Sequence, residues 1–413
     1  MPDQKTLRNY ARLAIETGVN VQKGQLLVIS CPVTHSDFAH LCMEEAYRCG
    51  AGEVWMNWAD EDAERINLLY GEEAFLAKIP EYQLARVKEA QERKAAFLHI
   101  ISPVPGIMAG VDEAKAGRIS KSRRKAMAPY QAYSMASKGQ WSILALPNPR
   151  WAVQVFPEEK DPEIAEQKLW NAILNTVYVN AEDDPVATWK AHSREIRHHC
   201  DLLDQKHFKA IHFHNSLGTD LTVGLAEEHL WGGGEEKASE IGCLFNPNLP
   251  TEEVFTTPDR MHVDGTVYAS RPLLYEGHRI ENFSVTFEHG KAVSCHADKG
   301  EETLKQILSS DENSDRLGEV ALISYDTPIS EMKILFLNTL FDENASCHLA
   351  FGASYPGQIE NGTKMSEEEL KEHGGNVSEI HVDFMFGTAD LTADGIYEDG
   401  TSEPVFRDGR FVF

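Results

Sequence analysis

The sequence predicts an α/β protein with an N-terminal doubly wound α/β domain and a C-terminal domain of mixed, β-rich α+β type. At 413 residues the chain exceeds what one hydrophobic core usually holds, so two domains are expected. Strand and helix patterns alternate over residues 1–183, which is typical of a parallel sheet with crossover helices. Strand patterns dominate residues 184–413, so we place the boundary at the Asp183-Asp184-Pro185 break.

The N-terminal elements follow from hydrophobic periodicity. Apolar residues recur at helical spacing over residues 4–18, and the apolar run 25–30 predicts a buried parallel strand. The alternation continues with helices at 36–50, 61–70 and 80–94, and with strands at 53–57, 96–101 and 140–146. Gly50-Ala51-Gly52 precedes a strand, whereas a dinucleotide-binding loop follows one and opens a helix. Nucleotide binding is therefore not expected.

The second half of the chain has mainly strand patterns. Helical patterns at 161–176 and 184–203 connect the two halves, and segments 209–215 and 220–225 form a hairpin-like pair. Few helical patterns lie between the later strand candidates, which are 266–270, 283–288, 319–324, 333–337 and 379–386. We therefore expect a β-rich domain whose late strands supply the ionisable residues.

Composition excludes several classes of protein. Lys and Arg number 39 against 65 Asp and Glu, a net charge of −26, and no basic stripe is present, so nucleic acid is not an expected partner. The longest near-apolar stretch is broken by His99, Pro103 and Pro105, so no membrane-spanning helix is expected. The N-terminus lacks an apolar signal region, and the seven cysteines include no CxxC pair. These features predict a cytoplasmic protein with free thiols.

Candidate metal ligands occur in four separate segments. Extended alternation places His381 and Asp383 on one face of a strand, where a single ion could bind both. Glu319 opens a predicted strand, for which a solvated strand end is the more ordinary interpretation. Glu253 follows Glu252, and Glu252 is the more obvious solvent-facing charge.

The densest of the four segments is 338–348. It follows the apolar run 334–337, which reads as a buried strand, and it brings together two acids, a cysteine and a histidine. Glu343 and His348 can reach an ion, whereas Asp342 and Cys347 are better suited to the turn and the core. Together the four segments predict a divalent-metal site.

Two further histidines are weaker candidates. His212 and His214 share a face of a strand, but no acidic residue lies immediately beside them, so we expect a surface or supporting role. Neither a Gly-x-Ser-x-Gly motif nor a His-Glu-x-x-His helix is present, which argues against serine hydrolases and thermolysin-like zinc sites.

Taken in order, segments 248–256, 317–320, 338–348 with Tyr355, and 378–385 resemble the aminopeptidase T/aminopeptidase S family of dinuclear metallopeptidases. The resemblance spans essentially the whole chain and looks closest to the aminopeptidase S branch. It implies a metal-dependent aminopeptidase that releases N-terminal residues from peptides through a metal-activated water. The β-rich domain would then be the catalytic domain.

The resemblance also implies a ligand set and partners. The metal ligands would be Glu253, Glu319, Glu343, His348, His381 and Asp383. Glu319 would bridge two divalent ions (zinc, cobalt or manganese), and Tyr355 would hydrogen-bond the oxyanion. Glu319, or Glu252, would transfer the proton. Homodimers are common in the family, and the substrates would be peptides with a free N-terminus.

Two alternatives remain open at the level of sequence. One is a two-domain peptide- or solute-binding protein, in which the acidic cluster binds a ligand without turning it over. The other is a dinuclear metallohydrolase acting on another amide or on a phosphoester. The acidic composition makes an anionic substrate less suitable for this chain.

Overall fold

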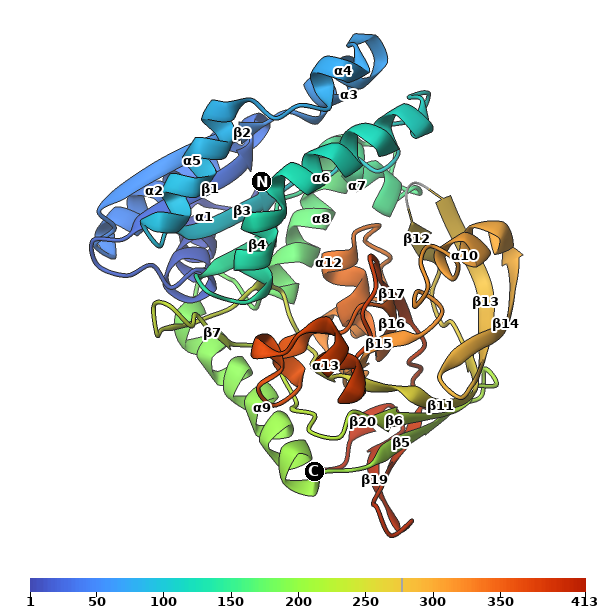
Figure 1. Ribbon diagram of the computed structural model, residues 1–413. Helices are drawn as coiled ribbons and strands as arrows, with labels where there is room; N and C mark the ends of the chain where they lie inside the picture. The colour runs from blue at the N-terminus through green and yellow to red at the C-terminus, as the bar shows by residue number, and fades with distance from the viewer. Residues whose placement is uncertain (276–277) are drawn as a thin grey trace. The chain divides into compact units, whose positions relative to one another are not determined.

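The computed structural model describes residues 1–275 and 278–413 (Figure 1). The chain forms two compact units: residues 1–192 together with 235–250, and residues 193–234 together with 251–413. The division into domains at 183/184 stays a prediction; the compact units differ from it because the first unit extends to His192 and also includes residues 235–250.

The first unit contains a five-stranded parallel sheet in the order β2-β1-β3-β4-β9. Its strands are β1 (Leu26–Pro32), β2 (Glu53–Ala59), β3 (Ala96–Ile101), β4 (Trp141–Ala145) and β9 (Asn248–Leu249). Chain order reverses direction at β1, as in doubly wound sheets. A small hairpin of β7 (Glu236–Lys237) and β8 (Leu244–Phe245) completes the strands of this unit.

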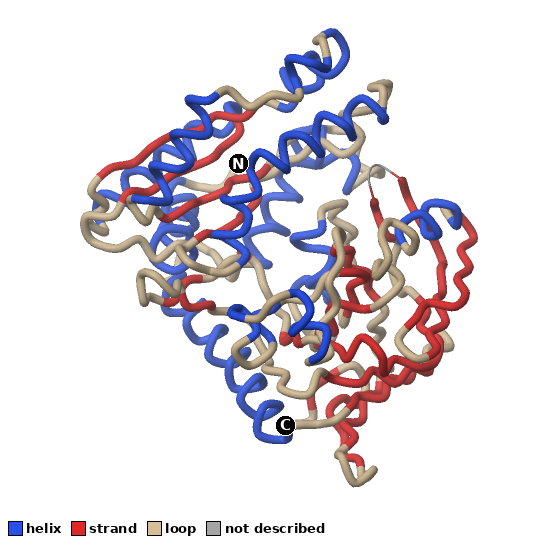
Figure 2. Tube along the Cα trace, viewed as in Figure 1, coloured by secondary structure: helices blue, strands red, loops and turns tan. Residues whose placement is uncertain are grey.

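Helices connect these strands, and Figure 2 shows them in blue around the red strands of the sheet. They are α1 (Gln4–Leu13), α2 (Ser36–Arg48), α3 (Glu61–Tyr70), α4 (Glu73–Leu76), α5 (Glu81–Glu92), α6 (Glu113–Met135), α7 (Pro149–Val155) and α8 (Pro162–Thr176). A π-helical turn (Ala14–Gly18) extends α1. Helix α9 (Pro185–Lys206) begins in the first unit and ends in the second.

The second unit is built on two antiparallel sheets. Among the residues that the structure describes, the larger has nine strands: eight in the order β12-β13-β11-β6-β5-β18-β19-β20, and β14 beside β13. Its strands are β5 (Ala210–His214), β6 (Asp220–Leu225), β11 (Pro258–Tyr268), β12 (Leu273–Tyr275), β13 (His278–Glu288), β14 (Lys291–Lys299), β18 (Thr392–Ile396), β19 (Ser402–Arg407) and β20 (Arg410–Phe411).

The smaller sheet has the order β10-β15-β16-β17 and carries four of the six candidate ligands. Its strands are β10 (Val254–Thr256), β15 (Leu317–Leu322), β16 (His348–Gly352) and β17 (His381–Met385). The short helices of this unit are α10 (Glu301–Ile307), α11 (Pro328–Met332), α12 (Thr339–Asp342) and α13 (Glu367–Glu372).

The core of the second unit explains why one face of the smaller sheet is available for chemistry. Alternate residues of its strands, including Val320, Phe351 and Phe384, enter a hydrophobic cluster shared with the larger sheet. The rings of Phe351 and Phe384 stack with centroids 4.5 Å apart. Because side chains alternate along a strand, Glu319 and Asp383 must lie on the opposite face.

Most predicted elements are confirmed, but the predicted strand at 333–337 is wrong. Lys333 and Leu337 have φ of 54° and 58°, and this left-handed backbone cannot continue a strand ladder. The run is apolar because it is a partly buried loop, in which Phe336 is fully buried. The 338–348 segment was expected to follow a strand, but it instead precedes one, β16.

Candidate metal centre

The register of the smaller sheet brings the candidate ligands together. Glu319 on β15 pairs with Ala350 on β16, and Ala350 pairs with Asp383 on β17, so the two acids belong to one row across three strands. A small residue at the centre of this row leaves space between the carboxylates. A β-bulge separates Leu317 from Glu319 and turns the Glu319 side chain relative to the regular pleat.

The two histidines flank this row on the same face of the sheet. His348 is the first residue of β16 and lies opposite Ala321, whereas His381 opens β17 and lies opposite Gly352. His348 lies two residues before Ala350, and His381 lies two residues before Asp383. Because side chains alternate along a strand, both histidines share the face of the Glu319–Ala350–Asp383 row. His348 is fully buried, with 1% of its side chain exposed, whereas the exposed fraction of the His381 side chain is 22%. The site is therefore open on the His381 side.

The remaining two candidates approach from flanking segments. Glu253 directly precedes β10, the edge strand beside β15. Its backbone is fixed by Asn344, whose Oδ1 accepts the N–H of Glu252 at 2.8 Å. Glu343 begins a 3-10 turn (Glu343–Ala345) that packs against β17.

Two overlapping groups of donor atoms form within the described part of the chain. Glu253, Glu319 and His348 make up one group, and Glu319, His381 and Asp383 make up the other; within each group the donor atoms lie within 4.8 Å of one another. Glu319 belongs to both groups. Its Oε1 lies 3.4 Å from His348 Nε2 and its Oε2 lies 3.2 Å from His381 Nε2.

These separations fit cation binding. His348 Nε2 also lies 3.4 Å from Glu253 Oε2, and His381 Nε2 lies 3.2 Å from Asp383 Oδ1. Tetrahedral coordination at about 2.0–2.1 Å gives ligand–ligand edges of about 3.3 Å. Each histidine therefore already stands at a ligand–ligand distance from two carboxylates.

Backbone carbonyls hold both imidazoles in the tautomer that a metal needs. His381 Nδ1–H donates to Ala353 O at 2.7 Å, and His348 Nδ1–H donates to Ser346 O at 3.4 Å. A protonated Nδ1 leaves the Nε2 lone pair of a neutral imidazole free for a cation.

The pKa values of the two histidines depend strongly on the neighbouring carboxylates. Burial alone would lower the pKa of His348, but Glu253 and Glu319 outweigh it and hold that pKa well above its usual range. For His381, burial is likewise outweighed, by Asp383 and Glu319. Charge in this site is therefore balanced by proton uptake on imidazole when no cation is bound.

The four carboxylates respond in two ways. At Glu253 burial prevails, and its pKa is raised although His348 lies beside it. Burial raises the pKa of Glu319 and Asp383, but the adjacent imidazoles more than offset this, and the net pKa shift of both is downward. Glu343 has no such partner, so burial and then the charges of Asp383 and Glu253 raise its pKa well above the usual value. Glu343 thus lies within electrostatic reach of the group without belonging to either set of close donor atoms.

Tyr355 stands beside the candidate ligands. Its ring lies 4.8 Å from the His381 ring and 5.6 Å from the Phe255 ring, measured between centroids. Burial, reinforced by Glu319 and Asp383, raises the pKa of the phenol well above its usual value. The hydroxyl therefore stays protonated and can donate a hydrogen bond.

The structure separates the residues named from the sequence into two sets. Five of the six candidate ligands come together in the two donor groups, and Glu343 and Tyr355 lie within electrostatic reach of them. Asp342 instead accepts the N–H groups of Phe336 and Asn338, and Cys347 contacts the Ile323 backbone through its sulfur, so both serve the turn and the core as expected.

His212 hydrogen-bonds Thr222, and neither it nor His214 belongs to the two donor groups. The expectation that Glu252 faces solvent is wrong: only 8% of the residue is exposed, and its backbone N–H donates to Asn344 Oδ1.

Two supporting residues were not anticipated. Asn344 holds the 252–253 backbone while its own Nδ2 donates to Leu340 O. At Gly318, an added Cβ would lie 2.2 Å from Ala353 O, so the bulge that orients Glu319 requires glycine. Pairing register and bulges depend on contacts between distant segments, and the only local sign was the Leu317-Gly318-Glu319 sequence itself.

The chain is similar to known proteins over nearly its whole length. A family model described as thermophilic metalloprotease (M29) matches residues 3–411. Aminopeptidase AmpS of Bacillus subtilis (strain 168) is 42% identical over 407 residues, 98% of each chain. Aminopeptidase 2 of Geobacillus stearothermophilus is 41% identical over 410 residues, 99% of this chain and 98% of its own. The structure of wild-type AmpT from Thermus thermophilus matches with a TM-score of 0.92 and 40% identity, over 99% of this chain and 100% of the other.

Proposed function

Because the chain belongs to the M29 family of thermophilic metalloproteases and is a metalloaminopeptidase, we propose that its metal centre holds two divalent cations. The proposed ligands are Glu253, Glu319, Glu343, His348, His381 and Asp383. Nothing in the comparisons favours the binding-protein alternative or a different amide substrate.

One observation carries the proposal of two ions: the two oxygens of Glu319 face two different imidazoles, at 3.4 and 3.2 Å. A carboxylate shared in this way suits a bridge between neighbouring cations. One cation would be held by Glu253 and His348 and the other by His381 and Asp383, with Glu319 common to both. Glu343 completes the set and adds the charge needed beside two dications.

The chain's own groups account for orientation and proton transfer. Bound divalent cations supply Lewis acidity, which activates water and polarises the scissile carbonyl. Tyr355 donates its hydroxyl proton in a hydrogen bond to the carbonyl oxygen as negative charge develops there. For proton transfer we propose Glu252, which lies buried beside Glu253. Glu319, the other carboxylate expected in this role, would have both oxygens occupied as the bridge.

The substrate follows from the aminopeptidase activity: peptides with a free N-terminus. Imidazole together with carboxylate ligands suits zinc or cobalt, and manganese is also compatible. We further propose a cytoplasmic homodimer. Within the described residues, no helix is long and apolar enough to cross a membrane.

Glu319→Gln tests the ligand assignment, with Glu312→Gln on an exposed residue as the matched control. We expect Glu319→Gln to lower both the bound metal and the hydrolysis of aminoacyl 4-nitroanilides, because the variant loses the charge shared by both donor groups. Glu312→Gln should retain both properties. Retention of full metal content and turnover in Glu319→Gln would remove Glu319 from the centre.

A further inference from the structure

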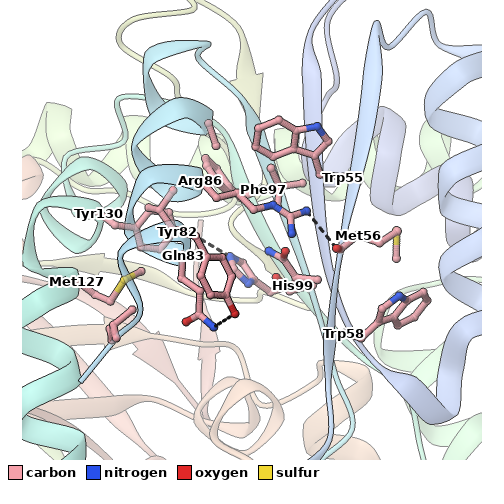
Figure 3. A pocket seen from close by; sticks show the side chains of 16 residues that line it. Trp55, Met56, Trp58, Tyr82, Gln83, Arg86, Phe97, His99, Met127 and Tyr130 are labelled. Atoms are coloured by element: carbon pink, nitrogen blue, oxygen red, sulfur yellow. Dashed lines mark hydrogen bonds between the residues drawn. The ribbon is translucent and has the colours of Figure 1, made fainter. Parts of the chain in front are cut away.

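A separate cavity of about 500 Å³ lies in the first compact unit (Figure 3). Its lining comes mainly from one face of strands β1, β2 and β3 and from helices α5 and α6. This volume is typical of pockets for small molecules. All lining residues lie within residues 1–192, whereas the candidate metal ligands belong to the second unit.

One part of the cavity wall is a row of neutral polar side chains. Ser30 pairs with Asn57 on one side and with His99 on the other, so the three residues lie side by side across three parallel strands. His99 Nε2 is 3.3 Å from the hydroxyl of Tyr130. Within the described residues, the side chains of Ser30 and Asn57 have no hydrogen-bond partner and face the cavity. Donors and acceptors are thus available for a ligand.

The neighbouring row is apolar. Val28 pairs with Trp55 and with Phe97, two residues before the polar row on each strand. The ring of Tyr130 packs edge-on against Phe97, with centroids 5.3 Å apart. These flat surfaces match a planar ring system, and the polar row beside them matches a ligand with a polar edge.

The charged side chains of the cavity indicate the charge of the ligand that it can bind. Among the described lining residues Arg86 is the one charged side chain, and no carboxylate is present. The Arg86 guanidinium lies 5.1 Å from the centre of the Trp55 ring and donates to Met56 O at 3.2 Å, which brings it from α5 to the edge of the sheet (Figure 3). In a chain of net charge −26, a pocket with a cation and no carboxylate favours an anionic head group over an amine.

We propose that this cavity is a binding site for a small aromatic carboxylate. The ring lies against Val28, Trp55 and Phe97. The carboxylate is paired with the guanidinium of Arg86, which offers further N–H donors. Ser30 and Asn57 receive polar substituents of the ring.

The test uses three probes with the same ring and different heads: 1-naphthoate, 1-naphthalenemethanol and 1-naphthylmethylamine. Each is titrated by calorimetry into the full-length, metal-loaded protein and again after the metal is removed with a chelator. We expect 1-naphthoate to bind at least about tenfold more tightly than the amine, with or without metal. Binding that vanishes with the metal would place the probe at the metal centre and overturn the proposal.

Two matched pairs of variants locate the site. Arg86→Met should weaken 1-naphthoate about fivefold or more and leave the neutral alcohol unchanged. Arg93→Met is the control, because the Arg93 guanidinium also lies over Trp55, at 5.3 Å, yet is not part of the lining. Val87→Phe should block all three probes by filling the cavity, whereas Lys88→Phe on the exposed side of α5 should not.

The proposal fails if 1-naphthoate shows no saturable binding below about 1 mM, or if the three probes bind equally well. It also fails if Arg86→Met and Arg93→Met behave alike. Arg86 is exposed, so its variant should keep the native thermal unfolding curve, which is recorded alongside.

Discussion

Glu319 presents one carboxylate oxygen to each of two histidines: Oε1 lies 3.4 Å from His348 Nε2, and Oε2 lies 3.2 Å from His381 Nε2. The histidines stand on different strands, β16 and β17, so this relationship depends on sheet register rather than on sequence spacing. A glutamate in this position links two donor groups into one centre. The proposed dinuclear centre of this metalloaminopeptidase depends on Glu319 being shared by both donor groups.

Gly318→Ala should damage both the fold and the site. The added Cβ would lie 2.2 Å from Ala353 O, a backbone atom that cannot move aside without shifting the β15–β16 pairing. We expect the free energy of unfolding to fall by about 2 kcal/mol or more, as measured by urea denaturation. Aminopeptidase activity should fall as well, because Glu319 follows directly.

Gly357→Ala is the control for this change. No heavy atom lies within 4 Å of the Cβ that it would add, and its φ is not positive. Equal stability and activity of the two alanine variants would contradict the role given to the Gly318 bulge.

Tyr355→Phe should lower kcat about 10²-fold or more if the hydroxyl stabilises the developing oxyanion. The ring contacts with His381 and Phe255 are retained by phenylalanine, so KM and metal content should change little. Tyr70→Phe, on a residue that is 82% exposed, serves as the control. A Tyr355→Phe enzyme with native kcat would exclude the phenol from the reaction.

Metal affinity should rise with pH. The carboxylates around His348 and His381 raise their pKa values well above the usual range, although burial acts in the opposite direction. Since only neutral imidazole binds a cation, metal binding must displace these protons, and lowering the pH strengthens their competition. Calorimetry in buffers of different ionisation enthalpy should therefore detect proton release at pH 7.

Dissociation constants measured at pH 6, 7 and 8 provide the second half of that test. The constants should decrease steadily over this range, because each step upward removes more of the competing protons. Constants that do not change with pH, together with no proton release, would show that these imidazoles are not ligands.

Much of the fold was predictable because the elements of the first unit have strong local signals. The apolar run at 25–30 became β1 with small shifts at its ends, and the run at 96–101 coincides with β3. Helix α6 was missed because its apolar residues follow no clear period and Pro129 interrupts it. The strand expected at 333–337 failed because hydrophobicity alone cannot distinguish a buried loop from a strand.

The candidate site was predictable in its residues but not in its geometry. The His381–Asp383 pair followed from alternation on one strand, and the structure places the facing nitrogen and oxygen 3.2 Å apart. The meeting of Glu253 with His348 depends on Asn344 and on the pairing of β10 with β15, which no local pattern reveals. Glu343 stays outside both groups of close donor atoms, and this too depends on the tertiary structure.

The most direct test of the dinuclear centre is metal content by elemental analysis, paired with turnover of aminoacyl 4-nitroanilides before and after chelation. The account predicts about two divalent ions per chain, with turnover lost on chelation and restored by zinc, cobalt or manganese. A single ion per chain at full activity, or turnover that survives complete removal of the metal, would contradict it.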